Sequence, residues 1–95
     1  MEELDPLLHS QLRLAVMSLL LSVDEADFVY LKEKTDSTSG NLSVQLEKLS
    51  AAGYISKETD GSGAKARTVC RMTDEGRAAM QKYVDALKTY FSALK

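Results

Sequence analysis

T-D-S-T-S-G-N-L-S-V-Q-L-E-K-L-S-A-A-G-Y, residues 35–54, is the stretch that decides the fold. It holds three leucines at the i, i+4 and i+7 spacing of one helical face, namely Leu42, Leu46 and Leu49. The hydroxyl of Thr38 can accept from free N–H groups of a first helical turn, and Gly53 supplies the left-handed residue that ends a helix. We therefore predict a helix over 38–52 whose other face, polar except for Val44, is free to meet a partner.

Two helices are predicted before this one. Asp5-Pro6 is typical of an N-cap followed by proline at the first helical position, and the helix is expected over 5–22. A shorter helix is expected over 26–34. Residues 35–37 then make a tight turn into the helix over 38–52. Two helices joined this closely form a helix-turn-helix.

A β-hairpin and a last helix are predicted after Gly53. Over 54–72 the pattern becomes that of two short strands joined by a Gly/Ser turn, and its alternation places Cys70 on the core side. Thr73 then caps a helix over 73–94 whose first turn carries two acids, which suits the positive end of a helix dipole. The predicted class is α+β and mostly helical, in one domain over 1–95.

The first and last helices carry more apolar residues than one buried face needs. A second stripe on the helix over 5–22 is covered either by a later helix of the same chain or by a second subunit, and the pattern does not separate these readings. The last helix has a heptad-like seam about two heptads long. The residues predicted at a dimer interface are Leu7, Leu14, Met17, Leu21, Tyr83, Leu87, Tyr90, Phe91 and Leu94.

Composition is that of an ordinary globular domain. The chain has 95 residues, of which 44% are hydrophobic and 27% charged. The acidic N-terminus does not resemble a signal peptide, and the apolar stretch 14–21 is too short to span a bilayer. One cysteine excludes an internal disulfide and fits a reducing compartment, so the cytoplasm is expected and no membrane association.

Charge is unevenly distributed along the chain. The net charge is −2, but residues 1–36 carry eight acids and three bases, whereas residues 37–95 carry six acids and nine bases. Residues 61–72 contain Lys65, Arg67 and Arg71 and no acid. Such a local excess of positive charge can attract an anionic partner even when the whole chain is acidic.

No arrangement of residues predicts catalysis, a metal or a cofactor. His9, the single histidine, lies among apolar neighbours and is not part of a sequence-near arrangement of an acid and a nucleophile. One cysteine and one histidine cannot complete a structural zinc site. Gly61-Ser62-Gly63 lacks the glycine spacing and the lysine of a phosphate-binding loop. We therefore expect a protein that is not an enzyme.

Three segments together resemble the winged helix-turn-helix regulators of the MarR and ArsR type, and in particular the small stand-alone ones. They are A-D-F-V-Y-L-K (26–32), G-N-L-S-V-Q-L-E-K-L-S-A-A-G-Y-I (40–55) and R-T-V-C-R-M-T-D-E-G-R (67–77). The resemblance implies a three-helix core, a hairpin wing and a long C-terminal helix that dimerises. It also implies a transcriptional regulator that binds double-stranded DNA.

The same resemblance implies which residues face DNA. The helix over 38–52 would enter the major groove, with base contacts from Ser39, Asn41, Val44 and Gln45. The amides of Asn41 and Gln45 are the best readers because such groups can bridge N6 and N7 of adenine. Backbone contacts would come from Thr38, Ser43, Lys48, Lys57, Lys65, Arg67 and Arg71. This helix departs from the family, whose corresponding helices usually carry an arginine or histidine near the middle, because residues 38–49 offer only Lys48.

The function predicted is that of a homodimer that regulates transcription from a pseudo-palindromic operator. The alternative is a winged-helix module that binds protein and has little affinity for DNA, which the scarcity of positive charge on 38–52 favours. A small-molecule effector at the dimer interface, near His9, Tyr83 and Tyr90, is compatible with the first reading. Tyrosines on a helical stripe are, however, more often part of a core.

Overall fold

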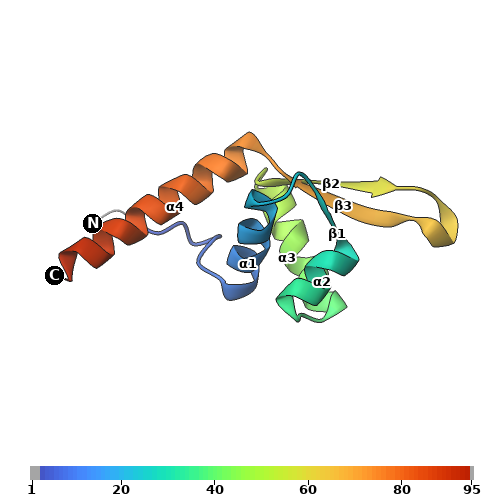
Figure 1. The fold of residues 1–95 in the computed structure, drawn as a ribbon, viewed down its shortest axis with the longest axis horizontal. Helices are drawn as coiled ribbons and strands as arrows, with labels where there is room; N and C mark the ends of the chain where they lie inside the picture. Colours follow the sequence, from blue (N-terminus) through green and yellow to red (C-terminus); the bar gives the residue numbers. More distant parts are fainter. Residues whose placement is uncertain (1–2, 95) are drawn as a thin grey trace.

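The computed structural model describes residues 3–94, which form four α-helices and a small antiparallel sheet. Figure 1 shows the elements, which follow one another in the order α1 (Gln11–Leu21), β1 (Ala26–Asp27), α2 (Phe28–Thr35), α3 (Ser39–Ala51), β2 (Ile55–Asp60), η1 (Gly63–Lys65), β3 (Arg67–Met72) and α4 (Asp74–Ala93). This is the winged helix-turn-helix that the sequence predicts. The α+β, mostly helical class is confirmed.

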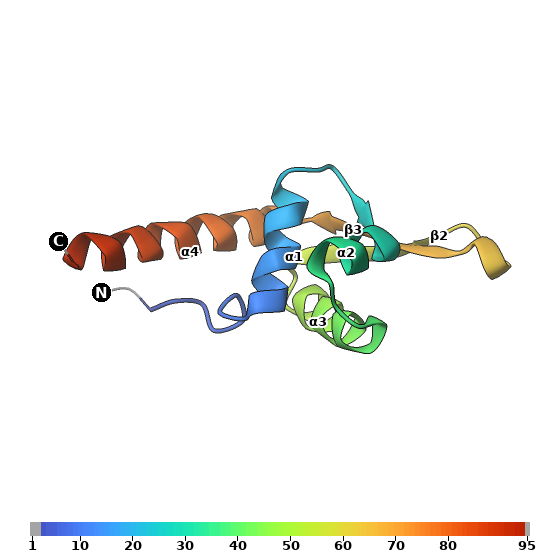
Figure 2. The ribbon, with the colours of Figure 1, turned by 60° about the horizontal axis from the view of Figure 1, so that its bottom comes forward.

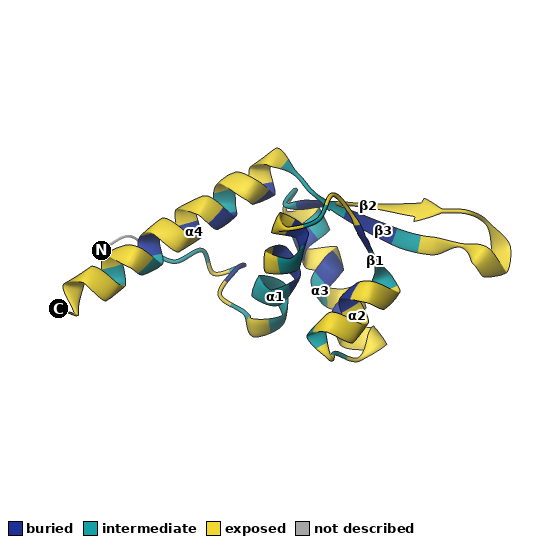
Figure 3. Cartoon of the chain, in the orientation of Figure 1, coloured by how far each residue is buried: buried dark blue, intermediate teal, exposed yellow. Residues whose placement is uncertain are grey.

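The three helices α1, α2 and α3 pack around one apolar core beneath the sheet. Leu42, Leu46 and Leu49, the stripe that predicted α3, are all at most 1% exposed. They meet Val16, Met17 and Leu20 of α1, Leu31 of α2 and Ile55 and Cys70 of the sheet in the same cluster. The other face of α3 remains exposed because the core needs only one of its faces (Figure 3).

The sheet joins the wing to the start of the helix-turn-helix. Its strand order is β1-β3-β2, and both pairings are antiparallel. Cys70 pairs with Lys57 on one side and with Ala26 on the other, so these three side chains share the face of the sheet toward α3. Val69 pairs with Glu58 and Asp27, which puts Arg67, Val69 and Arg71 on the opposite face.

The turn into α3 is built as the sequence predicts. The Thr38 hydroxyl accepts a hydrogen bond from the Asn41 N–H at 3.1 Å. Asp36 ends α2 in the left-handed conformation, with φ of 52°, which aspartate tolerates better than most residues. Gly53 has φ of 81° and follows the end of α3.

The predicted start of the first helix is wrong. Asp5 and Pro6 open a separate turn, in which the Asp5 carbonyl accepts from the N–H groups of Leu8 and His9. Ser10 is extended, with φ of −147° and ψ of 130°, so α1 begins only at Gln11. This break turns Leu8 into the core, where it is fully buried. The predicted range 26–34 likewise included two residues, Ala26 and Asp27, that form β1.

The wing and α4 extend in opposite directions from the helical core, and the molecule measures 54 × 25 × 21 Å (Figures 1 and 2). The wing pairs β2 with β3, and η1 lies at its tip. The buried residues Met80, Tyr83 and Ala86 pack α4 on the core. Its last turns stand clear of the core, and Phe91 is 61% and Leu94 82% exposed.

Two residues predicted at a dimer interface belong to the core of the single chain. Met17 is fully buried and Tyr83 is 4% exposed, because the helices of the same chain cover them. Leu7, Leu14, Leu87 and Tyr90 are half-buried, and Leu21, Phe91 and Leu94 are exposed. Residues of the same chain thus cover only part of the second apolar stripe. None of the helices within 3–94 has the length and apolar character that a bilayer span requires.

Candidate nucleic-acid interface

The outward face of α3 presents a narrow strip flanked by polar side chains. Gly40, Val44, Lys48 and Ala51 form the strip, and all are exposed. Val44, which is 51% exposed, lies between the two flanks. On the flank toward α1 lie Asn41 and Gln45, and on the flank toward the wing lie Ser43 and Glu47.

The predicted reader pair, Asn41 and Gln45, is joined by a direct hydrogen bond. The Gln45 Nε2 group donates to Asn41 Oδ1 at 3.0 Å. Arg13 of α1 donates from Nη1 to Gln45 Oε1, and its Nε donates to the Leu7 carbonyl at 2.5 Å. Asn41 is exposed and Gln45 half-buried, so the pair lies at the surface but is held from behind by α1.

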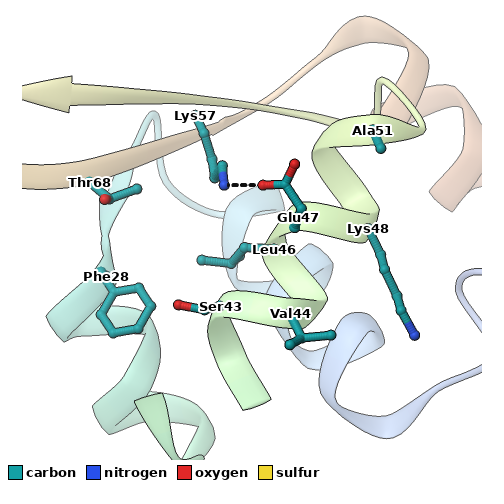
Figure 4. Close-up of a pocket in the computed structure, with 9 residues that line it drawn as sticks. All are labelled: Phe28, Ser43, Val44, Leu46, Glu47, Lys48, Ala51, Lys57 and Thr68. Carbon is teal, nitrogen blue, oxygen red and sulfur yellow. Dashed lines mark hydrogen bonds and ion pairs between the residues drawn. The ribbon is translucent and has the colours of Figure 1, made fainter. Parts of the chain in front are cut away.

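A groove of about 540 Å³ runs between α3 and the wing (Figure 4). Its apolar lining comes from Phe28, Val44, Leu46 and Ala51, and Ser43 and Thr68 add hydroxyl groups. Lys57 of β2 crosses the groove to Glu47 of α3, with 2.7 Å between Nζ and Oε2. This hydrogen bond and the charge of Lys57 lower the pKa of Glu47. The pair therefore joins α3 to the wing. It also engages Lys57, one of the cations predicted to contact the DNA backbone.

Two of the cations that were predicted to contact the DNA backbone remain available to a ligand. Lys48 projects from the exposed strip of α3, and Lys65 lies in η1 at the tip of the wing. Within residues 3–94, neither forms an ion pair. Thr38 and Ser39 are exposed at the start of α3, and the Thr38 hydroxyl keeps its proton free to donate because its oxygen serves as the cap.

Arg67 and Arg71 are each held by two carboxylates on the face of the sheet away from α3. Arg67 contacts Asp27 and Asp60, both at 3.2 Å. Arg71 contacts Glu25 at 2.7 Å and also pairs with Glu58. These carboxylates raise the pKa of both guanidinium groups. Val69 lies between the two arginines and is only 3% exposed.

This arrangement changes what the wing can offer to DNA. The predicted contacts Arg67 and Arg71 would have to exchange carboxylates for phosphates, so they are weaker candidates than Lys65. Their partners Glu25 and Asp27 precede α2, so two of the four ion pairs also tie the wing to the helix-turn-helix.

The groups with reactive chemistry are used in packing. Cys70 is fully buried, and burial raises the pKa of its thiol to about 11. His9 Nδ1 lies 3.1 Å from the Tyr83 hydroxyl, which joins the segment before α1 to α4. No three His, Cys, Asp or Glu side chains among residues 3–94 are grouped as a metal site would require. Binding of an effector near His9, Tyr83 and Tyr90 stays a prediction. Of these three residues, Tyr83 belongs to the core of the single chain.

The sequence prediction missed Arg13. No role was predicted for it, although its neighbours along α1 include Leu12, Leu14 and Val16. A lone arginine in so apolar a helix needs a polar partner, and here that partner is Gln45. The acidic partners of Lys57, Arg67 and Arg71 were missed as well.

Comparison with known proteins gives consistent matches over most of the chain. Residues 12–91 match the model of the family described as winged helix DNA-binding domain. An uncharacterised protein of Methanocaldococcus jannaschii is 32% identical over 76 residues, which are 80% of this chain and 83% of the relative. Both matches span the helix-turn-helix and the wing.

Solved structures show the same architecture. The transcriptional regulator homologue from Pyrococcus horikoshii OT3 superposes with a TM-score of 0.85 at 27% identity, covering 94% of this chain and 88% of the other. A MarR-family transcriptional regulator from Silicibacter pomeroyi superposes with a TM-score of 0.72 at 19% identity, covering 93% of this chain and 58% of the other. The second likeness is one of fold alone.

Proposed function

The chain belongs to the winged helix DNA-binding domain family, and from this premise we propose that it regulates transcription as a homodimer that reads a pseudo-palindromic duplex through α3. One observation carries the proposal. The face of α3 opposite the core leucines exposes Asn41, Val44 and Lys48 to solvent, and among residues 3–94 no other element covers them. A helix with one buried and one free polar face is what major-groove reading requires.

The division of roles follows from geometry and charge. Asn41, Val44 and Gln45 lie where they would meet base edges, with Ser39 at the start of the helix. Thr38, Ser43 and Lys48 flank them and would meet phosphates. Lys65 would extend the contact at the wing tip, and Lys57, Arg67 and Arg71 would add to it where their carboxylate partners yield.

The dimer would form through α4. From its middle to its C-cap, α4 carries Val84, Phe91 and Leu94 at 38%, 61% and 82% exposure, beside half-buried Leu87 and Tyr90. An apolar strip of this kind on a helix that projects from the core is suited to pairing with the same strip of a second copy. Two copies would then place their α3 helices about 34 Å apart, one turn of duplex.

Sedimentation equilibrium tests the dimer. We expect a dimer at micromolar concentration, and a monomer for the double variant Phe91→Glu, Leu94→Glu with unchanged helical content. Val29→Glu is the matched control, because Val29 is 61% exposed on α2, apart from the α4 strip. A wild-type monomer at micromolar concentration would refute the dimer and leave DNA binding open.

Selection from random duplexes at two salt concentrations tests DNA binding. Asn41→Ala and Gln45→Ala should each reduce base preference by about 1–3 kcal/mol at the positions they read. Lys65→Ala should weaken all sequences alike and reduce the salt slope by about one unit. Lys88→Ala is the control, since it removes the same charge from an exposed position on α4. Binding that is equal for all variants and insensitive to salt would contradict the proposal.

A protein-binding module is the second candidate. It is favoured by the carboxylates that hold Lys57, Arg67 and Arg71, which leave few free cations near α3. In that case the apolar groove beside Phe28 and Val44 would be the contact surface. This reading predicts no salt-dependent binding to any duplex, and the same selection experiment decides between the two.

A further inference from the structure

The Arg13 side chain fixes the polarity of a hydrogen-bond chain that ends at the surface of α3. Its Nε donates to the Leu7 carbonyl at 2.5 Å, and its Nη1 donates to Gln45 Oε1. Gln45 Nε2 then donates to Asn41 Oδ1 at 3.0 Å. The series of hydrogen bonds therefore begins at Leu7, before α1, passes through Arg13 of α1 and ends at the exposed side chain of Asn41 on α3.

The direction of this chain follows from the chemistry of arginine. A guanidinium has five N–H donors and no acceptor, so the Gln45 atom that faces Arg13 must be the carbonyl oxygen. The Gln45 amide nitrogen must then face Asn41, and the Asn41 atom that receives it must again be the oxygen. The amide oxygen of Gln45 therefore faces Arg13, and the amide oxygen of Asn41 faces Gln45.

As a consequence, the surface of α3 at Asn41 and Gln45 offers hydrogen-bond donors. The Asn41 oxygen is engaged by Gln45, whereas the Asn41 NH₂ group makes no hydrogen bond within residues 3–94 and is exposed. Gln45 Nε2 keeps a second N–H beyond the one given to Asn41. Free amides bind adenine by pairing one donor with one acceptor, and here Gln45 already takes one of the two lone pairs of the Asn41 oxygen.

We propose that Arg13 is a positioning residue that sets the base preference of α3 by turning the amides of Asn41 and Gln45 so that they offer N–H groups to DNA. The base read by this pair is then guanine, whose O6 and N7 are adjacent acceptors in the major groove, rather than adenine. This rests on the proposed reading of duplex DNA by α3, and it replaces the adenine contact expected from the residue types alone.

The experiment compares sites selected by the wild-type chain and by Arg13→Ala, Arg13→Lys and Asn41→Ala. The position read by the pair is the one at which Asn41→Ala loses preference. There we expect the wild type to favour guanine over adenine by about fivefold or more. Arg13→Ala should reduce that ratio to about one, because the Gln45 amide is then free to rotate. Arg13→Lys, which again has donors only, should restore it.

A probe on the DNA side does not depend on how well Arg13→Ala folds. Replacing the guanine at that position by 7-deazaguanine removes the N7 acceptor and should weaken wild-type binding by about fivefold. Thermal unfolding of each variant separates loss of structure from loss of preference. A merely structural Arg13 would change overall affinity or stability without changing the ratio of bases.

The outcomes separate this inference from the function it rests on. Failure to enrich any duplex with the wild-type chain would refute DNA reading itself. Enrichment of a site with adenine at the Asn41-dependent position would overturn the inference and leave the function standing. The same holds if folded Arg13→Ala keeps the wild-type ratio of guanine to adenine.

Discussion

The carbonyl oxygen of Tyr54 fills the space in which a side chain at Gly76 would lie. A Cβ at Gly76 would be 2.0 Å from that oxygen, and 2.8 Å from the sulfur of Met72. A hydrogen-bonded contact lies beside it, since the Thr73 hydroxyl donates to the Gly53 carbonyl at 2.6 Å while accepting from the Gly76 N–H at 2.9 Å. The end of α3 and the start of α4 are thus packed backbone to backbone.

Gly76→Ala should therefore destabilise the protein severely, by about 3 kcal/mol, because backbone rather than a flexible side chain has to move. Urea unfolding followed by circular dichroism measures the change. Gly40→Ala is the control in another helix: a Cβ there meets nothing within 4 Å, and the substitution should stabilise by about 0.5–1 kcal/mol. Equal effects of the two substitutions would show that this close approach does not govern stability.

Tyr54 also ties the segment before α1 to the rest of the chain. Its hydroxyl donates to Asp5 Oδ2 at 2.5 Å, and this hydrogen bond, with partial burial, raises the pKa of Tyr54 to about 12. An unfolded tyrosine titrates near pH 10. The neutral phenol is thus favoured by folding, and its contribution is complete below about pH 10 and is lost between about pH 10 and 12.

Tyr54→Phe should lower the free energy of unfolding by about 1 kcal/mol at pH 7. The difference from wild type should stay constant up to about pH 10 and close as the pH approaches 12. Unfolding curves collected across this range measure it. In an Asp5→Ala background the same substitution should cost little. A difference that does not change up to pH 12 would show that the Asp5 contact contributes nothing.

Local patterns in the sequence were sufficient to predict the helix-turn-helix and the wing. The leucines of α3 repeat at helical spacing and are all buried, and Thr38 and Thr73 both cap the helices that they precede. Asp60 and Arg67 lie opposite each other across the hairpin, so their pairing could have been read from the predicted turn. These features depend only on residues close to one another in sequence or register.

Features that depend on tertiary contacts were not predicted. The turn at Asp5 is favoured over a helix partly because its carboxylate binds Tyr54, 49 residues later. Arg13 meets Gln45 only because α1 packs along α3, and nothing in the spacing of either residue indicates it. Met17 and Tyr83 show the same limit, since a stripe on one helix does not reveal which chain covers it.

Thr38 permits a test that separates helix stability from DNA binding. Thr38→Asp keeps an oxygen that can cap the Asn41 N–H and adds a negative charge at the positive end of α3, so stability should be equal or higher by up to about 1 kcal/mol. The same carboxylate would face phosphates, and affinity for duplex DNA should fall by at least about tenfold. Thr38→Ala should instead lose about 1 kcal/mol of stability with the cap.

Thermal unfolding and fluorescence anisotropy on one selected duplex provide the two measurements for Thr38. Thr38→Ser is the matched control because it retains both the capping oxygen and the hydroxyl proton. If Thr38→Asp binds DNA as tightly as the wild type, the start of α3 does not face phosphate and the docking proposed for this helix is wrong.

Glu47 provides the opposite test, in which a substitution should strengthen binding. Its carboxylate lies on the outward half of α3 and holds Lys57, with 2.7 Å between the charged atoms. Glu47→Gln removes a charge that repels phosphate and releases a lysine to meet one. We expect affinity to rise roughly tenfold at low salt and the salt slope to steepen by about one unit. Stability should hardly change, because Glu47 is exposed.

Binding to one duplex at several salt concentrations checks this expectation. Asp85→Asn is the control, since it removes one negative charge from an exposed position of α4. A gain confined to Glu47→Gln would place that carboxylate at the phosphate backbone and identify the Lys57 pair as a contact that DNA must displace. Equal small gains in both variants would indicate a general effect of net charge and would remove Lys57 from the interface.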